Sequence, residues 1–165
     1  MPKPKEESIA KSQRELYAHP GHLIRRLNQI SVSIFLTEAK EYDLTHIQYA
    51  SLTVIAANAG IDQSNLGRLV AIDRQTVSTV VRRLCEKGLV RREQKDGRSG
   101  ALFVTGSAKA LIKVLSARLP VVDQLLLEPL SPEEQDIFME LLTKVVNGNN
   151  SLSRAPLRPD APKTA

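Results

Sequence analysis

The stretch DRQTVSTVVRRLCEKGLVRREQKDGRSGALFVT, residues 73–105, decides the fold of this chain. It begins with a basic helical pattern that ends at Gly88, and two short strand-like runs follow at 89–90 and 102–104. Asp96-Gly97 supplies turn chemistry between the two runs. A helix fits the major groove of double-stranded DNA, and a basic hairpin can reach the neighbouring minor groove. The order of these elements therefore predicts a reader of duplex DNA.

A second short helix precedes this stretch. Asp62 begins the pattern DQSNLGRLVAI and Asp73 begins the next one, and each carboxylate can accept hydrogen bonds from free backbone N–H groups. Two short helices with a tight connection form a helix-turn-helix. In its second helix Val77, Val81 and Leu84 share one face, which we expect to lie inward.

The opposite face of the second helix carries side chains that bond bases or phosphates. Gln can bond adenine, Arg can bond guanine, and Ser or Thr can reach phosphate or a base edge. A polar face that is merely solvated would carry the same residue types. The positive charge around this face favours DNA binding over that alternative. The predicted DNA-binding residues are Ser64, Asn65, Arg74, Gln75, Thr76, Ser78, Thr79, Arg82, Arg83, Lys95, Asp96 and Arg98.

Two of these residues belong to the predicted hairpin tip. We expect Arg98 to enter the minor groove, where narrow A·T stretches concentrate negative potential. Asp96 either holds the Arg98 guanidinium in one orientation or is simply a turn residue. The sequence does not separate these two roles.

Apolar helical patterns flank the predicted DNA-binding module on both sides. One runs from about 20 to 42, and others cover about 107–146, where Pro120 predicts a kink and Ser131 a new helix start. These helices are more apolar than one small module can cover, which predicts association with a second copy. The expected fold is mainly α: a helix-turn-helix with a small β-hairpin wing covers about 45–105, and dimerisation helices cover about 20–42 and 107–146. We expect flexible ends at 1–15 and 147–165 around one domain at 16–146.

Composition narrows the class of protein. The chain has 165 residues, 42% of them hydrophobic, and a formal net charge of +5, which favours polyanionic partners. We expect a cytoplasmic protein without a membrane segment or signal peptide. Three histidines and one cysteine without paired carboxylates give little material for a catalytic site, so we expect no enzyme, cofactor or metal. Cys85 is either a small packing residue or a redox sensor.

The chain resembles the MarR family of winged helix-turn-helix regulators over roughly residues 20–146. The resemblance rests on LTHIQYASL, DQSNLGRLV, RQTVSTVVRRLCEKGLVRRE and KDGRSGALFVT. Its most specific pieces are the end of the second helix, Arg83 to Arg91, and the tip residues Asp96 and Arg98 followed by Thr105. The resemblance implies a homodimer whose outer helices interlock, a palindromic operator, and repression relieved by a small ligand that is often aromatic or phenolic.

The resemblance also places a ligand pocket between the dimer base and the wing module. The predicted effector-binding residues are His19, His22, Arg25, Arg26 and Tyr49. An Arg or His can pair with a ligand carboxylate while Tyr49 packs on a ring. The same basic residues can instead be solvated or bind carboxylates of the partner subunit. The predicted function is a dimeric, sequence-specific regulator released by an aromatic or other anionic effector. The alternatives are redox sensing through Cys85 and non-specific architectural binding of DNA.

Overall fold

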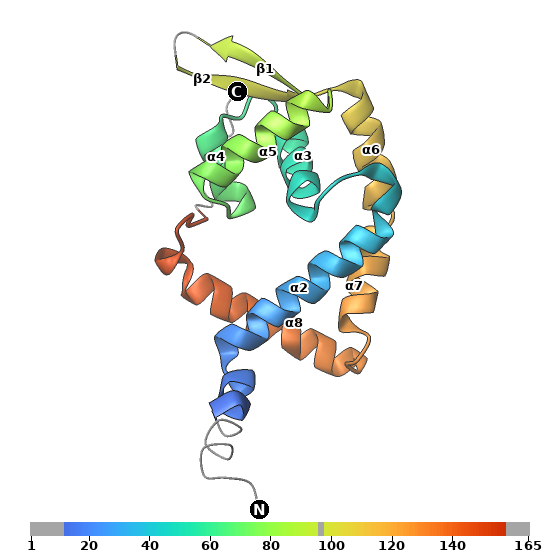
Figure 1. Ribbon diagram of the computed structural model, residues 1–165, viewed down its shortest axis with the longest axis vertical. Helices are drawn as coiled ribbons and strands as arrows, with labels where there is room; N and C mark the ends of the chain where they lie inside the picture. The colour runs from blue at the N-terminus through green and yellow to red at the C-terminus, as the bar shows by residue number, and fades with distance from the viewer. Residues whose placement is uncertain (1–11, 96–97, 158–165) are drawn as a thin grey trace, which may run out of the picture.

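The computed structural model describes residues 12–95 and 98–157, except the side chains of residues 95, 98 and 99. Its upper part in Figure 1 is a helix-turn-helix with a hairpin. The helices are α3 (His46–Ala57), α4 (Gln63–Val70) and α5 (Arg74–Glu86).

Side-chain caps start these helices. Thr45 Oγ1 accepts a hydrogen bond from the Gln48 backbone N–H (3.2 Å), and Gln48 Oε1 accepts one from the Thr45 N–H (3.1 Å), so the two residues form a capping box. Asp62 and Asp73 accept from the third residue of α4 and α5, each at 2.9 Å. The end of α5 is also confirmed, because Gly88 follows its last turn in the left-handed conformation (φ +66°).

The hairpin pairs β1 (Val90–Lys95) with β2 (Arg98–Val104) in antiparallel register, with a shift between Glu93 and Lys95. The strands are longer than the runs expected from the sequence, because polar residues continue the pairing toward the tip. The root of β2 is fixed to the loop between α3 and α4: Leu102 donates to the Ile61 carbonyl (3.0 Å) and accepts from the Gly60 N–H (2.9 Å). These two hydrogen bonds attach the root of the wing to the helix-turn-helix.

The core lies between α3, α4, α5 and the root of the wing. Leu52, Ile55 and Leu66 are fully buried there together with Leu102. Val77, Val81 and Leu84 also point into it, as predicted for the inner face of α5. This arrangement fixes the opposite face of α5 toward solvent.

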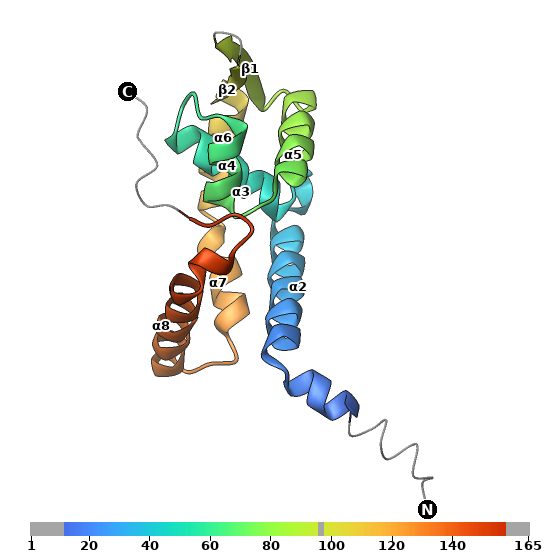
Figure 2. The same ribbon diagram turned by 90° about the vertical axis from the view of Figure 1, so that its left-hand side faces the viewer.

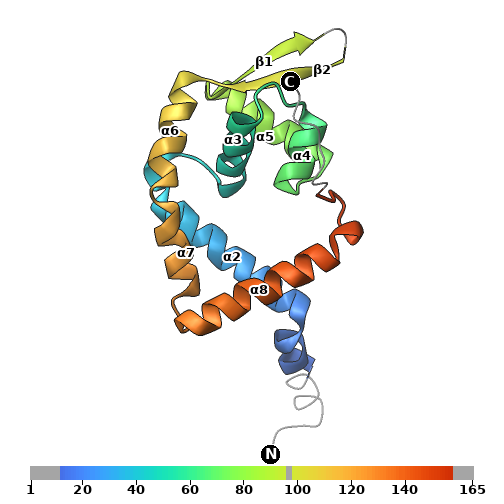
Figure 3. The same cartoon turned by 180° about the vertical axis from the view of Figure 1, so that it is seen from behind.

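The remaining helices lie beside and below this module in Figure 1. They include α2 (Pro20–Glu38), a short turn η1 (Lys40–Tyr42), α6 (Gly106–Ser116), α7 (Leu119–Leu127) and α8 (Pro132–Gly148). Residues 12–18, which overlap the end predicted to be flexible, are also helical. Figure 3, seen from behind, shows α6 and α7 continuing down one side and α8 crossing in front of α2. In Figure 2, α2 and α8 lie on opposite sides below the wing module, and α7 is in contact with α2.

The expected kinked helix over 107–127 was wrong. Two helices occupy this region, with a break at 117–118, and Pro120 is the second residue of α7. A proline in the first helical turn needs no hydrogen-bond partner for its nitrogen, so it favours a new start over a bend. At the other end, α8 continues to Gly148 and a short turn η2 (Asn150–Leu152) follows, inside the stretch predicted as a tail.

Candidate nucleic-acid interface

The outward face of α5 carries a row of polar side chains. Gln75, Ser78 and Thr79 are exposed, as are Arg74 and Arg82. Their row lies opposite the buried valines of the same helix, so the packing of the core determines which way they point. The structure thus brings most of the predicted base-reading residues onto one accessible helix face.

Two residues of this set already have partners within the chain. The Arg82 guanidinium forms an ion pair with Glu86 at 2.8 Å, and both side chains are more than half exposed. Thr76 is half-buried, and its hydroxyl donates to Asp73 Oδ2 at 2.8 Å. The backbone N–H and the hydroxyl of Thr76 lower the pKa of the Asp73 carboxyl. Thr76 therefore stabilises the start of α5, while Arg82 is held near the outer face.

The two predicted residues of α4, Ser64 and Asn65, differ in how exposed they are and in whether they have partners within the chain. Ser64 is exposed beside the start of the helix. Asn65 is half-buried: its amide nitrogen donates to Asp62 Oδ2 at 2.7 Å, and its oxygen accepts from Arg68. Asn65 thus extends the Asp62 cap, which leaves Ser64 as the more accessible of the pair.

The wing tip is described only in part. The backbones of Lys95 and Arg98 are paired across it, whereas Asp96 and the side chains of Lys95 and Arg98 lie outside the described residues. Nearer the root, the Arg91 guanidinium lies 4.6 Å from the centroid of the Phe103 ring and also pairs with Glu93. Arg91 is therefore held on the wing by a cation–π contact.

A cavity of about 530 Å³ lies where α2, α3 and α5 meet. It is lined by Asn28, Val32, Thr45, His46, Ile47, Gln48, Gln75, Thr76, Thr79, Val80 and Arg83. Four of these residues belong to the predicted DNA-binding set, and Arg83 also borders a second cavity below Lys87. Neither Asn28 nor His46 was predicted as a site residue. The only sequence signal for this wall of the cavity was the spacing of Asn28 and Val32, which lie one helical turn apart on α2.

The predicted effector-binding residues do not line this cavity. His19 caps α2 by accepting from the Gly21 N–H (3.2 Å), and the His22 ring lies 5.4 Å from that of Tyr17. Arg25 and Arg26 are exposed on the first half of α2. Tyr49 is only 5% exposed and packs on Phe35. Within one chain, the five residues are thus not brought together.

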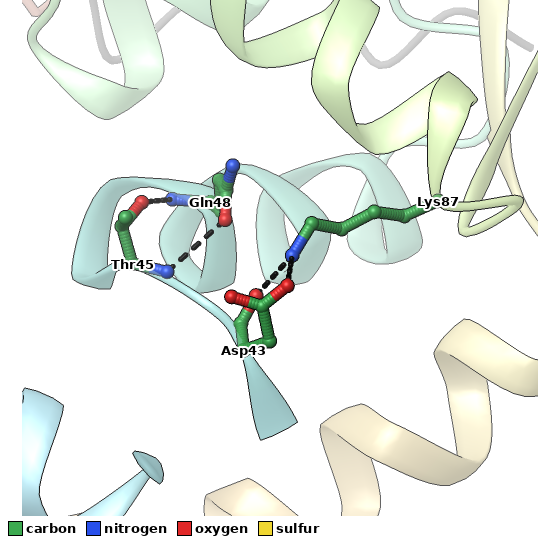
Figure 4. A network of polar contacts seen from close by, with 4 residues as sticks. All are labelled: Asp43, Thr45, Gln48 and Lys87. Atoms are coloured by element: carbon green, nitrogen blue, oxygen red, sulfur yellow. Dashed lines mark hydrogen bonds and ion pairs between the residues drawn. The ribbon is translucent and has the colours of Figure 1, made fainter. Parts of the chain in front are cut away.

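The loop after α2 connects the outer helices to the end of α5, the second helix of the helix-turn-helix and thus its recognition helix (Figure 4). Lys87, which follows α5, pairs with the Asp43 carboxylate at 2.6 Å and also donates to the Asp43 carbonyl. The hydrogen bond and the charge of Lys87 lower the pKa of the Asp43 carboxyl. On the other side, Arg118 pairs with Glu41 at 2.8 Å and donates to the Glu38 carbonyl at 3.3 Å. We name these contacts the 38–45 joint.

The described part of the chain offers little evidence for a metal site or a membrane-spanning helix. Among its residues, no three His, Cys, Asp or Glu side chains lie close enough together to hold a metal ion. None of the helices in 12–95 and 98–157 combines the length and the apolar character needed to cross a membrane. Cys85 is half-buried and packs against the core.

The fold and the exposed face of α5 define a winged helix-turn-helix DNA-binding protein. Residues 42–99 match the model of the MarR family. The transcriptional regulator HosA of Escherichia coli O127:H6 is 36% identical over 76% of this chain and 93% of its own length. The chain therefore belongs to the MarR family of transcriptional regulators, and its relatives are regulators rather than enzymes.

Two solved structures extend the comparison. The PcaV regulator of Streptomyces coelicolor, in complex with its natural ligand, has 36% identity and a TM-score of 0.72, covering 79% of this chain and 94% of its own. BpsR of Bordetella bronchiseptica, whose DNA binding is regulated by 6-hydroxynicotinic acid, has 26% identity and a TM-score of 0.72, covering 78% of this chain and 94% of its own.

Proposed function

We propose that this regulator is a dimeric repressor that binds a palindromic operator and leaves it when a small aromatic acid enters the cavity between α2, α3 and α5. The proposal rests on one observation, which is that α2 and α5 both line this cavity. One ligand there contacts α2, an outer helix, and α5, the helix that reads DNA. A ligand with such contacts can favour one arrangement of the two helices over another.

The lining of the cavity suits a ring with an anionic group. Val32, Ile47 and Val80 offer apolar contact, and Arg83 and His46 offer donors for a carboxylate or phenol oxygen. The ring of His46 already lies against Phe35, with centroids 5.2 Å apart. The regulation of BpsR by 6-hydroxynicotinic acid supports this ligand class. The residues predicted from the sequence at the start of α2, including His22 and Arg26, remain a prediction. We expect them to contact the ligand only in the dimer.

The dimer is supported by apolar side chains left exposed on the outer helices. On α2 these include Leu23, Ile24 and Ile30, and on α8 they include Ile137, Leu141 and Val145, all between 49% and 57% exposed. Burial of such faces against a second copy is favoured by about 25 cal/mol per Å². Two recognition helices about 34 Å apart would then meet successive major-groove faces of a palindrome.

The test measures DNA binding by fluorescence anisotropy, with DNA from upstream of the protein's own gene and with random DNA. We expect roughly a thousandfold preference for the upstream DNA at physiological salt. Adding 6-hydroxynicotinic acid or salicylic acid should weaken binding by about 5- to 150-fold, the usual size of an allosteric coupling.

Three variants and one control, Lys113→Ala, locate the ligand site. His46→Ala should bind DNA normally but lose the response to the acids, whereas Lys113→Ala, an exposed residue of α6, should keep it. His22→Ala and Arg26→Ala test the residues predicted from the sequence. Equal binding of both DNAs would refute a specific regulator, and a full response in His46→Ala would place the ligand elsewhere.

A further inference from the structure

The segment after α8 folds back on itself. The Asn150 side chain pairs with the backbone of Leu157: its Nδ2 donates to the Leu157 carbonyl (2.8 Å), and its Oδ1 accepts from the Leu157 N–H (2.8 Å). Ser153 Oγ accepts from the Ala155 N–H at 3.1 Å inside the loop so formed. We name residues 150–157 the C-terminal loop. The side chain of Asn150 acts on Leu157 as a backbone peptide would, so the loop has a defined shape.

The C-terminal loop lies against the helix-turn-helix. Figure 2 shows it below α4 and α5 on the side that faces the viewer. Arg154, Ala155 and Pro156 form one wall of a groove of about 570 Å³. The other wall comes from α4 and the start of α5 and includes Ser64 and Arg74. The groove is therefore continuous with two residues of the proposed DNA-binding surface.

The groove is positively charged. Arg68, Arg74 and Arg154 line it, and Asp73 is the acidic residue of its lining. The carboxylate of Asp73 is already occupied, since both of its oxygens accept hydrogen bonds from Thr76. Among the described residues, neither Arg74 nor Arg154 takes part in an ion pair. Ser64 adds an exposed hydroxyl.

We propose that the C-terminal loop is part of the DNA interface and that Arg154 contacts a phosphate beside the one reached by Ser64 and Arg74. Arginine is the side chain best suited to phosphate, and phosphate contacts fix the position of a protein on the duplex without reading its sequence. The proposal rests on the DNA-binding surface of the proposed function. It extends that surface from α4 and α5 onto a segment that follows the dimerisation helices.

The experiment compares Arg154→Ala with the full-length protein over a range of salt concentrations, on upstream and on random DNA. Each phosphate contact contributes about 0.9 to the slope of log affinity against log salt, so two copies per dimer should lower the slope by about 1.8. Between 50 and 200 mM salt the unchanged protein should then lose about tenfold more affinity than the variant. The loss should be alike on both DNAs, because a phosphate contact carries no sequence information.

Two further variants distinguish the effect of the position of Arg154 from the effect of the total charge of the protein. Lys113→Ala removes an exposed charge on α6, away from the groove, and should keep the full slope. Asn150→Ala keeps Arg154 but opens the C-terminal loop, and should lower the slope as Arg154→Ala does. Circular dichroism confirms that each variant is folded.

The outcomes are separable from those of the proposed function. If Arg154→Ala behaves as Lys113→Ala, or binds DNA more tightly than the unchanged protein, the proposal is overturned. An unchanged slope in Asn150→Ala also overturns it. Because random DNA carries the same phosphates, the result stands even if the protein shows no preference for the upstream DNA.

Discussion

Gly67 lies where α4 packs on α5, and it has no room for a side chain. A Cβ at this position would lie 2.7 Å from Val77 Cγ2 and 3.0 Å from the Ile72 carbonyl oxygen. Val77 is 2% exposed and cannot move aside without disturbing the core. The absence of a Cβ at this one residue therefore permits the close approach of the two helices in the helix-turn-helix.

We expect Gly67→Ala to destabilise the protein by about 1–3 kcal/mol, the usual cost of overpacking a core. The recognition helix should also shift, so DNA affinity should fall. Gly106→Ala is the matched control, because a Cβ there meets no atom within 4 Å. Thermal unfolding followed by circular dichroism measures both. Equal unfolding temperatures for the two variants would contradict the packing argument.

At the scale of elements, the 38–45 joint connects the loop after α2 both to Lys87 at the end of α5 and to Arg118 beside α7. The ion pair of Lys87 with Asp43 involves an exposed carboxylate, so it contributes little to the free energy of unfolding. Its effect is on geometry, because it fixes the end of α5 relative to the loop that follows α2. Arg118 holds the same loop from the side of α7.

We expect Lys87→Met to leave the unfolding temperature nearly unchanged and to weaken both DNA binding and the response to aromatic acids, by about fivefold or more. Lys109→Met, on the exposed side of α6, serves as the control for loss of a lysine charge. Anisotropy titrations with and without the acid measure both effects. A large drop in unfolding temperature, with the ligand response intact, would show that Lys87 is structural only.

The elements could be predicted from the sequence where their signals are local. The Thr45 and Gln48 capping box and the Asp73 cap each need only residues three positions apart, and each is present in the structure. The break before α7 was missed because Pro120 is compatible with either a kink or a first helical turn. The residues that line the cavity could not be predicted, because they come from three helices and periodicity does not reveal which faces meet. The fold of the C-terminal loop depends on one side chain, Asn150, in a composition typical of tails.

At the scale of the whole molecule, the outer helices leave large apolar side chains such as Leu23, Ile137 and Leu141 at least half exposed, and contiguous exposed apolar side chains mark association surfaces. We expect Leu141→Glu on α8 to shift the dimer toward monomer and to weaken operator binding, since one recognition helix makes half of the contacts. Val114→Glu, on α6, introduces the same charge at an exposed valine and should leave the dimer intact. Sedimentation equilibrium measures the association. A dimer of unchanged stability in Leu141→Glu would place the interface elsewhere.

The wall that α5 contributes to the cavity has a consequence for how this regulator can evolve. Gln75 and Thr79 face the cavity and also belong to the row proposed to read bases. A mutation that retunes the operator preference at either position also reshapes the chamber that would admit the effector. If Gln75 and Thr79 read bases and the cavity holds the effector, as proposed, then a change of operator preference and a change of inducer are coupled at these two positions.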